Sequence, residues 1–148
     1  MCLSRNETDP RSFRLATFPN DEGYDELVLA RAIPFRTLCE HRVAFSGIAH
    51  VGYLPGERIL GLSRLAGLVE HFGARPQTQE RLTMLVARCL EENLRPRGVG
   101  VVLEAEHTCA TRLGDGAAGA TAVTSALLGV LRTDPRSRAE FFALARSG

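Results

Sequence analysis

Cysteine and histidine occur together at two places where a strand is expected to end. Cys39 and His41 lie in the segment LCEHR, and His107 and Cys109 lie in the segment EAEHTC. Thiolate and imidazole are zinc ligands, and the same pair of groups also serves nucleophilic and proton-transfer chemistry. Together the two pairs would supply a zinc site of two cysteines and one histidine with a fourth position open to water. The plainer alternative for each pair alone is a chance juxtaposition.

An amide and a carboxylate stand side by side at the expected start of a helix, at Gln79 and Glu80 in the segment QTQER. A carboxylate accepts hydrogen bonds from ring N–H and amino groups, whereas an amide both donates and accepts them. This pair is therefore a candidate for reading the donor edge of a guanine-like ring. The alternative is that Glu80 is a solvated surface charge.

The composition excludes several kinds of chemistry. All 18 basic residues of the 148 are arginine, which we attribute first to genomic base composition. Without lysine, neither a Schiff base nor a P-loop phosphate site is available. The net charge of +1 gives no support for a nucleic-acid partner, which normally requires a basic excess on one face.

The sequence also indicates a compartment. No apolar run approaches the ~20 residues of a membrane helix, and the segment MCLSRNETDP has no apolar stretch typical of a secretory signal. We therefore expect no membrane partner and a cytoplasmic location. In that compartment the four scattered cysteines are ligands, thiols or core residues before they are disulfides.

Hydrophobic periodicity predicts the elements that position these residues. The expected helices carry apolar stripes at spacings of three and four, and Cys89 lies on the second stripe, so we expect it in the core. Strands are expected over 26–35, 43–54, 98–103 and 121–131, and helices over 62–73, 82–90 and from 134 onwards.

This order is typical of an α+β fold, in which two antiparallel helices cover one side of an antiparallel β-sheet. Residues 1–22 are polar and read as an N-terminal arm, and residues 23–148 read as one domain. A single small sheet leaves two edges open, so we expect pairing of copies edge to edge in a homo-oligomer.

Several segments resemble the GTP cyclohydrolase I family of the tunnelling-fold superfamily. The likeness extends from about Tyr24 to Ser147, with the family's spacing between motifs. The segments that carry it are LCEH at 38–41, HVGYLPG at 50–56, GLSRLA at 61–66, QTQERLT at 77–83, RPRGVGVVLEAEHTC at 95–109 and DPRSRAEFFAL at 134–144.

The resemblance implies an activity and an assembly. The family opens the imidazole ring of GTP, releases formate and recloses the product as dihydroneopterin triphosphate, with a zinc-activated water. Its subunits join their sheets into a barrel, form a ring and often stack two rings, with active sites between subunits. The longer N-terminal region of many members has no counterpart in this sequence, which would leave a single ring as an alternative.

The resemblance also implies residue roles. Cys39 and Cys109 match the two thiolate zinc ligands. The other matched positions are the proton-transfer histidines, His41 and His107; the residues that read the guanine edge, Gln79 and Glu80; and the phosphate-contacting Ser63 with Arg64 in place of a lysine.

Three positions depart from the family pattern. Arg42 stands where the third zinc ligand, a histidine, is expected, and a guanidinium is always charged and offers no lone pair. Gly67 and Leu113 stand where two arginines for the triphosphate are expected, with Arg112 one residue before the second position, an offset that a loop could absorb. We therefore expect no cofactor in the usual site, with zinc on Cys39 and Cys109 as the alternative.

These departures lead to three hypotheses. The first is a repurposed, zinc-independent enzyme for a small nitrogen heterocycle without a triphosphate. In it His41 and His107 act as acid and base, Cys39 or Cys109 offers a nucleophile, and Arg42 holds an anionic group or favours a thiolate. The second hypothesis is an active GTP cyclohydrolase I with an altered zinc site. The third is a non-catalytic binding or regulatory subunit.

Overall fold

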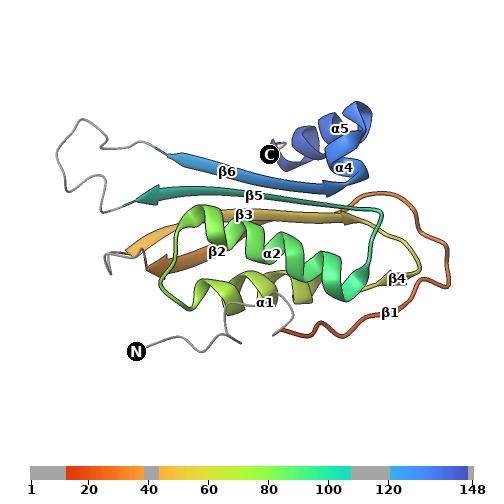
Figure 1. Ribbon diagram of the computed structural model, residues 1–148, viewed down its shortest axis with the longest axis horizontal. Helices are drawn as coiled ribbons and strands as arrows, with labels where there is room; N and C mark the ends of the chain where they lie inside the picture. Colours follow the sequence, from red (N-terminus) through yellow and green to blue (C-terminus); the bar gives the residue numbers. More distant parts are fainter. Residues whose placement is uncertain (1–12, 39–43, 108–120, 147–148) are drawn as a thin grey trace.

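The computed structural model describes residues 13–38, 44–107 and 121–146 (Figure 1). The predicted order of elements is confirmed, and the fold is α+β as expected. Along the chain the elements are β1 (Phe18–Pro19), β2 (Val28–Leu38), β3 (Ala44–Leu54), β4 (Arg58–Ile59), α1 (Leu62–Gly73), α2 (Gln79–Leu94), β5 (Gly98–His107), β6 (Ala122–Gly129), α4 (Val130–Thr133) and α5 (Pro135–Arg146).

The main sheet has four antiparallel strands in the order β2-β3-β5-β6. The two central strands pair over their whole length, from Phe45 opposite His107 to Leu54 opposite Gly98. The outer strands β2 and β6 have no further neighbour among the described residues, so the sheet has the two open edges that the sequence predicts.

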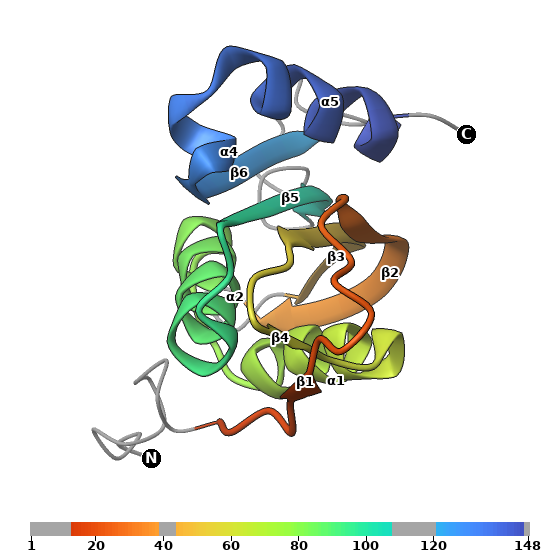
Figure 2. The ribbon, with the colours of Figure 1, turned by 90° about the vertical axis from the view of Figure 1, so that its right-hand side faces the viewer.

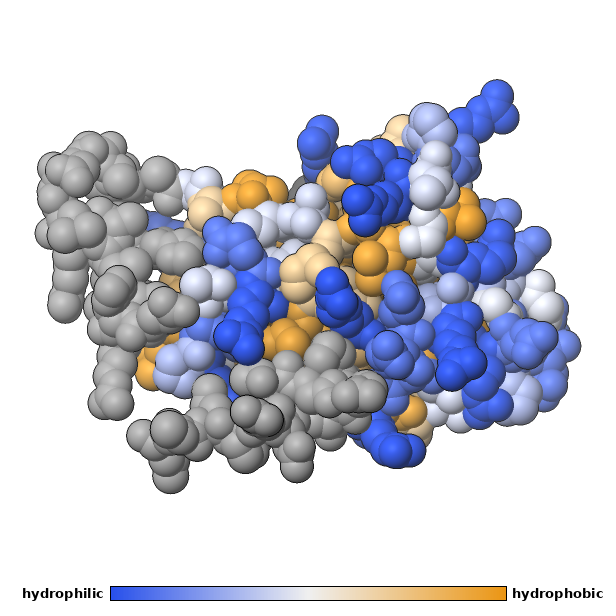
Figure 3. Space-filling model, in the orientation of Figure 1, coloured by the Kyte–Doolittle hydropathy of each residue, from blue (hydrophilic) through white to orange (hydrophobic). Residues whose placement is uncertain are grey.

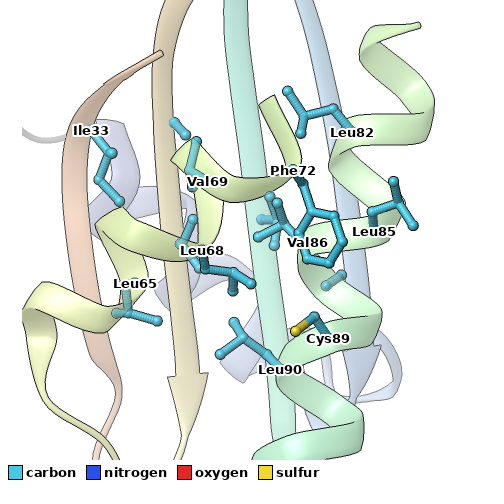
Figure 4. Close-up of a cluster of buried hydrophobic side chains, with 14 of the residues drawn as sticks. Ile33, Leu65, Leu68, Val69, Phe72, Leu82, Leu85, Val86, Cys89 and Leu90 are labelled. Carbon is cyan, nitrogen blue, oxygen red and sulfur yellow. The ribbon is translucent and has the colours of Figure 1, made fainter. Parts of the chain in front are cut away.

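Helices α1 and α2 cover one face of this sheet (Figure 2). Their apolar stripes point inward and interlock above the strands (Figure 4), because residues three and four apart share one face of a helix. Cys89 is fully buried in this cluster, as predicted. The helix residues of the core include Leu65, Leu68, Val69, Phe72, Leu82, Leu85, Val86 and Leu90.

The opposite face of the sheet is covered in part by α5. Phe141 is fully buried and packs in a second cluster with Val102, Leu127 and other apolar residues. A Cβ on Gly100 would lie 2.7 Å from the Phe141 ring, so the ring occupies the space that a side chain on the strand would fill. The small residue in β5 is therefore what lets α5 lie close to the sheet.

Several predicted boundaries are wrong: the strand expected over 98–103 continues to His107, and the helix expected over 82–90 covers Gln79–Leu94. The strand expected over 26–35 lies over 28–38, with a register shift between Ala30 and Ile33 where Ala32 takes a positive φ of 57°. A bulge of this kind disturbs the alternation from which strands are read. The strand expected to reach residue 131 ends at Gly129, whose φ of 64° turns the chain into the short helix α4.

The described part of the expected N-terminal arm, residues 13–22, packs against the domain. Leu15 is buried, its N–H donates to Asn93 Oδ1 at 3.0 Å, and Asn93 Nδ2 donates to the carbonyl of Phe13 at 3.1 Å. The Phe13 ring stacks on His71 with centroids 4.2 Å apart, and β1 pairs with β4. Residues 1–12 lie outside the described part of the chain.

The buried thiol of Cys89 makes a prediction for alkaline pH. Burial raises its pKa to about 12, against the smaller opposing effect of a hydrogen bond from Asn93. An unfolded thiol ionises near pH 8.5–9, so from roughly pH 9 to pH 12 unfolding releases a proton and the stability falls as the pH rises. We expect the free energy of unfolding to drop more between about pH 8 and pH 10.5 in the wild type than in Cys89→Ala. Equal drops in urea titrations of the two proteins would contradict this account.

Candidate active site

Three strand ends meet at one end of the sheet. Leu38 at the end of β2 pairs with Ala44 at the start of β3, and His107 at the end of β5 pairs with Phe45. His107 therefore occupies the last position of a central strand. The other candidates of these segments, Cys39, Glu40, His41, Arg42 and Cys109, lie outside the described residues.

The start of α2 lies at the same end of the sheet. The N–H of Gln77 donates to the carbonyl of Leu38 at 2.8 Å, which ties the turn before the helix to the end of β2. Thr78 is the N-cap, and its side chain accepts a hydrogen bond from the N–H of Arg81 at 3.2 Å. The first turn of α2 is thereby fixed beside the strand ends, and Glu80 in this turn is exposed.

The two members of the expected heterocycle-reading pair differ in their surroundings. Glu80 is exposed, whereas Gln79 is only 2% exposed. The amide Nε2 of Gln79 lies 3.2 Å from the carbonyl oxygen of Leu103, 3.0 Å from that of Ala122 and 3.1 Å from Thr124 Oγ1. The helix start is therefore bonded to both β5 and β6.

The expected phosphate-contacting residues lie at the other end of the domain. Ser63 and Arg64 are exposed in the first turn of α1, close to where the N–H of Leu60 reaches the hydroxyl of Tyr53 near the far end of β3. The 12 residues of α1 span about 18 Å at 1.5 Å per residue. Its last turn, not its first, adjoins the start of α2. One chain therefore does not bring Ser63 and Arg64 to Glu80.

No zinc site can be assembled from the described residues, which hold no group of three or more histidine, cysteine or acidic side chains. The donor set of the sequence does not complete the usual site either. Cys39 and Cys109 supply two thiolates, but Arg42 stands in place of the third ligand and carries a fixed positive charge. The residues thus do not fit a zinc ion held by two cysteines and one histidine in the family's arrangement.

Sequence reasoning missed a histidine–glutamate pair on the opposite face of the sheet. His50 is buried, its Nδ1 accepts from the N–H of Ala32 at 3.2 Å, and its Nε2 lies 3.0 Å from Glu104 Oε2. The pair lines a hollow of about 500 Å³ together with Phe142 and Arg146 of α5. The N–H that bonds the His50 ring belongs to Ala32, at the bulge in β2. No pattern in the sequence predicts that bulge.

Comparison with known proteins identifies the class of protein. The family model of GTP cyclohydrolase I matches residues 2–146. The chain is 50% identical over 140 residues to GTP cyclohydrolase 1 of Mycobacteroides abscessus, which is 93% of this chain and 68% of that protein. It is also 50% identical over 136 residues to GTP cyclohydrolase 1 of Mycobacterium tuberculosis, which is 90% of this chain and 66% of that protein. The chain belongs to the GTP cyclohydrolase I family, and it spans about two thirds of the length of these relatives.

A solved structure supports the fold. The crystal structure of the archaeosine synthase QueF-Like in the apo form has a TM-score of 0.54 to this chain, with 15% sequence identity, and covers 72% of this chain and 94% of that one. At this identity the likeness concerns the fold alone. The tunnelling fold expected from the sequence is confirmed.

Proposed function

We propose that the protein catalyses the GTP cyclohydrolase I reaction, in which the purine ring of GTP is opened, formate is lost and dihydroneopterin triphosphate is formed. The observation that carries the proposal is 50% identity to GTP cyclohydrolase 1 over 93% of the chain. The position of Glu80 beside the ends of β2 and β5 supports it, because this is the end of the sheet from which Cys39, His41 and Cys109 follow.

The proposed roles follow the chemistry of the side chains. Glu80 accepts hydrogen bonds from the donor edge of the guanine ring. His41 and His107 exchange protons with the ring and with the attacking water, since imidazole titrates near neutral pH. In this proposal Cys39 and Cys109 provide thiolates, and Arg42, which replaces the usual third zinc ligand, provides a fixed positive charge.

The proposed site is completed by a second copy of the chain. Ser63 and Arg64 lie at the far end of α1 from Glu80, so their contacts with the phosphates of one GTP require a neighbouring subunit. The open edges of β2 and β6 support such pairing. Hydrophobic atoms are also visible in the middle of the face between α2 and the C-terminal helices (Figure 3), where a hollow of about 240 Å³ is lined in part by Met84, Leu127 and Leu128. We therefore propose a homo-oligomeric ring, single or stacked in two.

A second candidate function is a repurposed enzyme that acts on a small nitrogen heterocycle without a triphosphate and without zinc. Arg42 at the third ligand position and Gly67 in place of a phosphate-binding arginine favour it. A charge-assisted hydrogen bond to phosphate contributes about 1.5–3 kcal/mol, so each missing arginine weakens GTP binding roughly 10- to 150-fold. A non-catalytic subunit is the third candidate, which co-purification with a full-length relative would favour.

The proposed function is tested by formate release from GTP and from guanosine, with the purified protein supplied with zinc or treated with a chelator. We expect formate from GTP together with a product that becomes a fluorescent neopterin on oxidation. Release from guanosine but not from GTP would favour the repurposed enzyme. No release from either, with or without zinc, would contradict the GTP cyclohydrolase I reaction.

Restoring the missing arginine is expected to strengthen GTP binding. Gly67 lies in α1 one turn after Arg64, and a Cβ there meets nothing within 4 Å, so an arginine fits without strain. We expect Gly67→Arg to lower the KM for GTP about tenfold through a charge-assisted contact with phosphate. Gly67→Ala is the control, because it stabilises the helix without adding charge. If both variants change the KM equally, the position does not contact phosphate.

The location of the protein remains a prediction from the sequence. None of the described helices is long and apolar enough to span a lipid bilayer. We propose a cytoplasmic enzyme. This location agrees with a reaction on a nucleoside triphosphate and with four cysteines that are scattered along the sequence rather than spaced as a disulfide framework.

A further inference from the structure

A buried polar cluster joins the start of α2 to β5 and β6. Besides the three contacts of Gln79 Nε2, the hydroxyl of Thr83 donates to the carbonyl oxygen of Gln79 at 2.8 Å and lies 2.7 Å from the hydroxyl of Thr124. Thr83 is 1% exposed and its bond to Gln79 is buried, whereas the contacts with Thr124 are partly buried. We call Gln79, Thr83 and Thr124 the polar latch.

The side-chain nitrogen of Gln79, which would donate to a ligand, is already engaged in hydrogen bonds to the sheet. An amide nitrogen carries two hydrogens, and Nε2 of Gln79 already faces three acceptors of the sheet. Turning it toward a substrate would remove this donor from the buried carbonyl of Leu103, and leaving a buried acceptor without a partner costs about 1–3 kcal/mol. The side-chain nitrogen of Gln79 therefore has a structural role, because it bonds α2 to the sheet. Glu80 is the exposed residue of the pair.

We propose that the polar latch is a positioning device for Glu80 that sets the preference for a purine with a 2-amino group; this inference rests on the proposed function. Glu80 directly follows Gln79, so the direction of its side chain depends on the position and orientation of the first turn of α2. Three contacts hold that turn: the bond from the N–H of Gln77 to the carbonyl of Leu38, the N-cap bond that the N–H of Arg81 donates to Thr78, and the polar latch. Gln79, Thr83 and Thr124 act through Glu80 and touch no substrate.

The preference for the 2-amino group is the property most sensitive to the orientation of this turn. A carboxylate that accepts from an amino group and a neighbouring ring N–H must be held in one orientation, because a hydrogen bond weakens steeply as its angle departs from linear. Buried, fully bonded networks supply such preorganisation. A loosened turn is expected to weaken the contact to the 2-amino group and to leave the phosphate contacts unchanged.

The test compares binding of GTP with binding of inosine triphosphate, which lacks the 2-amino group, by equilibrium titration and, where turnover is seen, by kcat/KM. Thr124→Val removes the hydroxyl but keeps the shape of the side chain. We expect it to reduce the preference for GTP over inosine triphosphate about fivefold, which is the loss of a typical hydrogen bond. Thr124→Ser keeps a hydroxyl and is expected to retain the wild-type preference.

Thr133→Val is the matched control, because its hydroxyl bonds within α4 to the carbonyl of Gly129, away from α2. It should lower stability slightly and leave the nucleotide preference unchanged. If Thr124→Val weakens binding of both triphosphates equally, or leaves both unchanged, the proposal is overturned. A wild type that binds GTP in preference to inosine triphosphate but opens neither ring would contradict the proposed function. The role of the polar latch is then tested by the binding preference of the variants alone.

Discussion

Replacing Gly47 by alanine is expected to destabilise the protein more than any surface substitution. A Cβ at this position would lie 1.9 Å from the carbonyl oxygen of Glu104 and 2.7 Å from the Cα of Ala105. These are backbone atoms of the neighbouring strand β5, so no side-chain rotation relieves the overlap. The two central strands must separate or the sheet must bend, next to the strand ends that carry the candidate site.

We expect Gly47→Ala to cost about 3 kcal/mol, at the upper end of the range for overpacking. For a chain of this size that lowers the melting temperature by roughly 6–12 °C. Gly67→Ala is the control, since its Cβ has open space and alanine is the better helix former by up to about 1 kcal/mol. In thermal unfolding, the melting temperature should therefore fall for Gly47→Ala and rise for Gly67→Ala. A Gly47→Ala protein that melts with the wild type would contradict the close approach of β3 and β5.

Neutralising Glu80 is expected to produce the largest loss of activity among single changes in the described residues. Glu80 lies exposed in the first turn of α2, beside the end of β2, where Gln77 is bonded to Leu38. Glu80→Gln keeps the size of the side chain but replaces one acceptor oxygen with a donor and removes the charge. The charge-assisted contact to the guanine edge is thereby lost.

The expected decrease in kcat/KM for GTP is about 10- to 150-fold, the equivalent of 1.5–3 kcal/mol. The control is Glu92→Gln, an exposed glutamate near the other end of the same helix. Its substitution makes the same change in charge and should leave kcat/KM within a factor of two of wild type. Unchanged activity of Glu80→Gln would remove this residue from the proposed site.

The sequence was sufficient to predict the elements because the apolar spacing of α1 and α2 and the alternation in β3 follow the simple rules of burial. The stripe that includes Leu65, Leu68 and Leu82 forms the core as expected. It was insufficient where the backbone departs from regular geometry. β2 contains a bulge at Ala32 and continues to Leu38 through its pairing with β3, and the positive φ of Gly129 ends β6 early.

The candidate site was predictable in part. The resemblance pointed to Gln79 and Glu80, and the structure brings both to the end of the sheet at which β2 and β5 end. Their different surroundings were not predictable, because the burial of Gln79 depends on Thr124, which lies 45 residues away in the chain. The separation of Ser63 from Glu80 follows from the direction of α1, which only the packed structure defines.

We propose that one active site takes Glu80 from one subunit and Arg64 from another, and mixed oligomers test this arrangement most directly. Glu80→Gln and Arg64→Ala are each expected to impair formate release from GTP. Co-expressed with two different tags and purified through both, they should recover activity, because some sites then combine an intact Glu80 with an intact Arg64. Mixed oligomers no more active than the two separate variants would contradict a site shared between subunits.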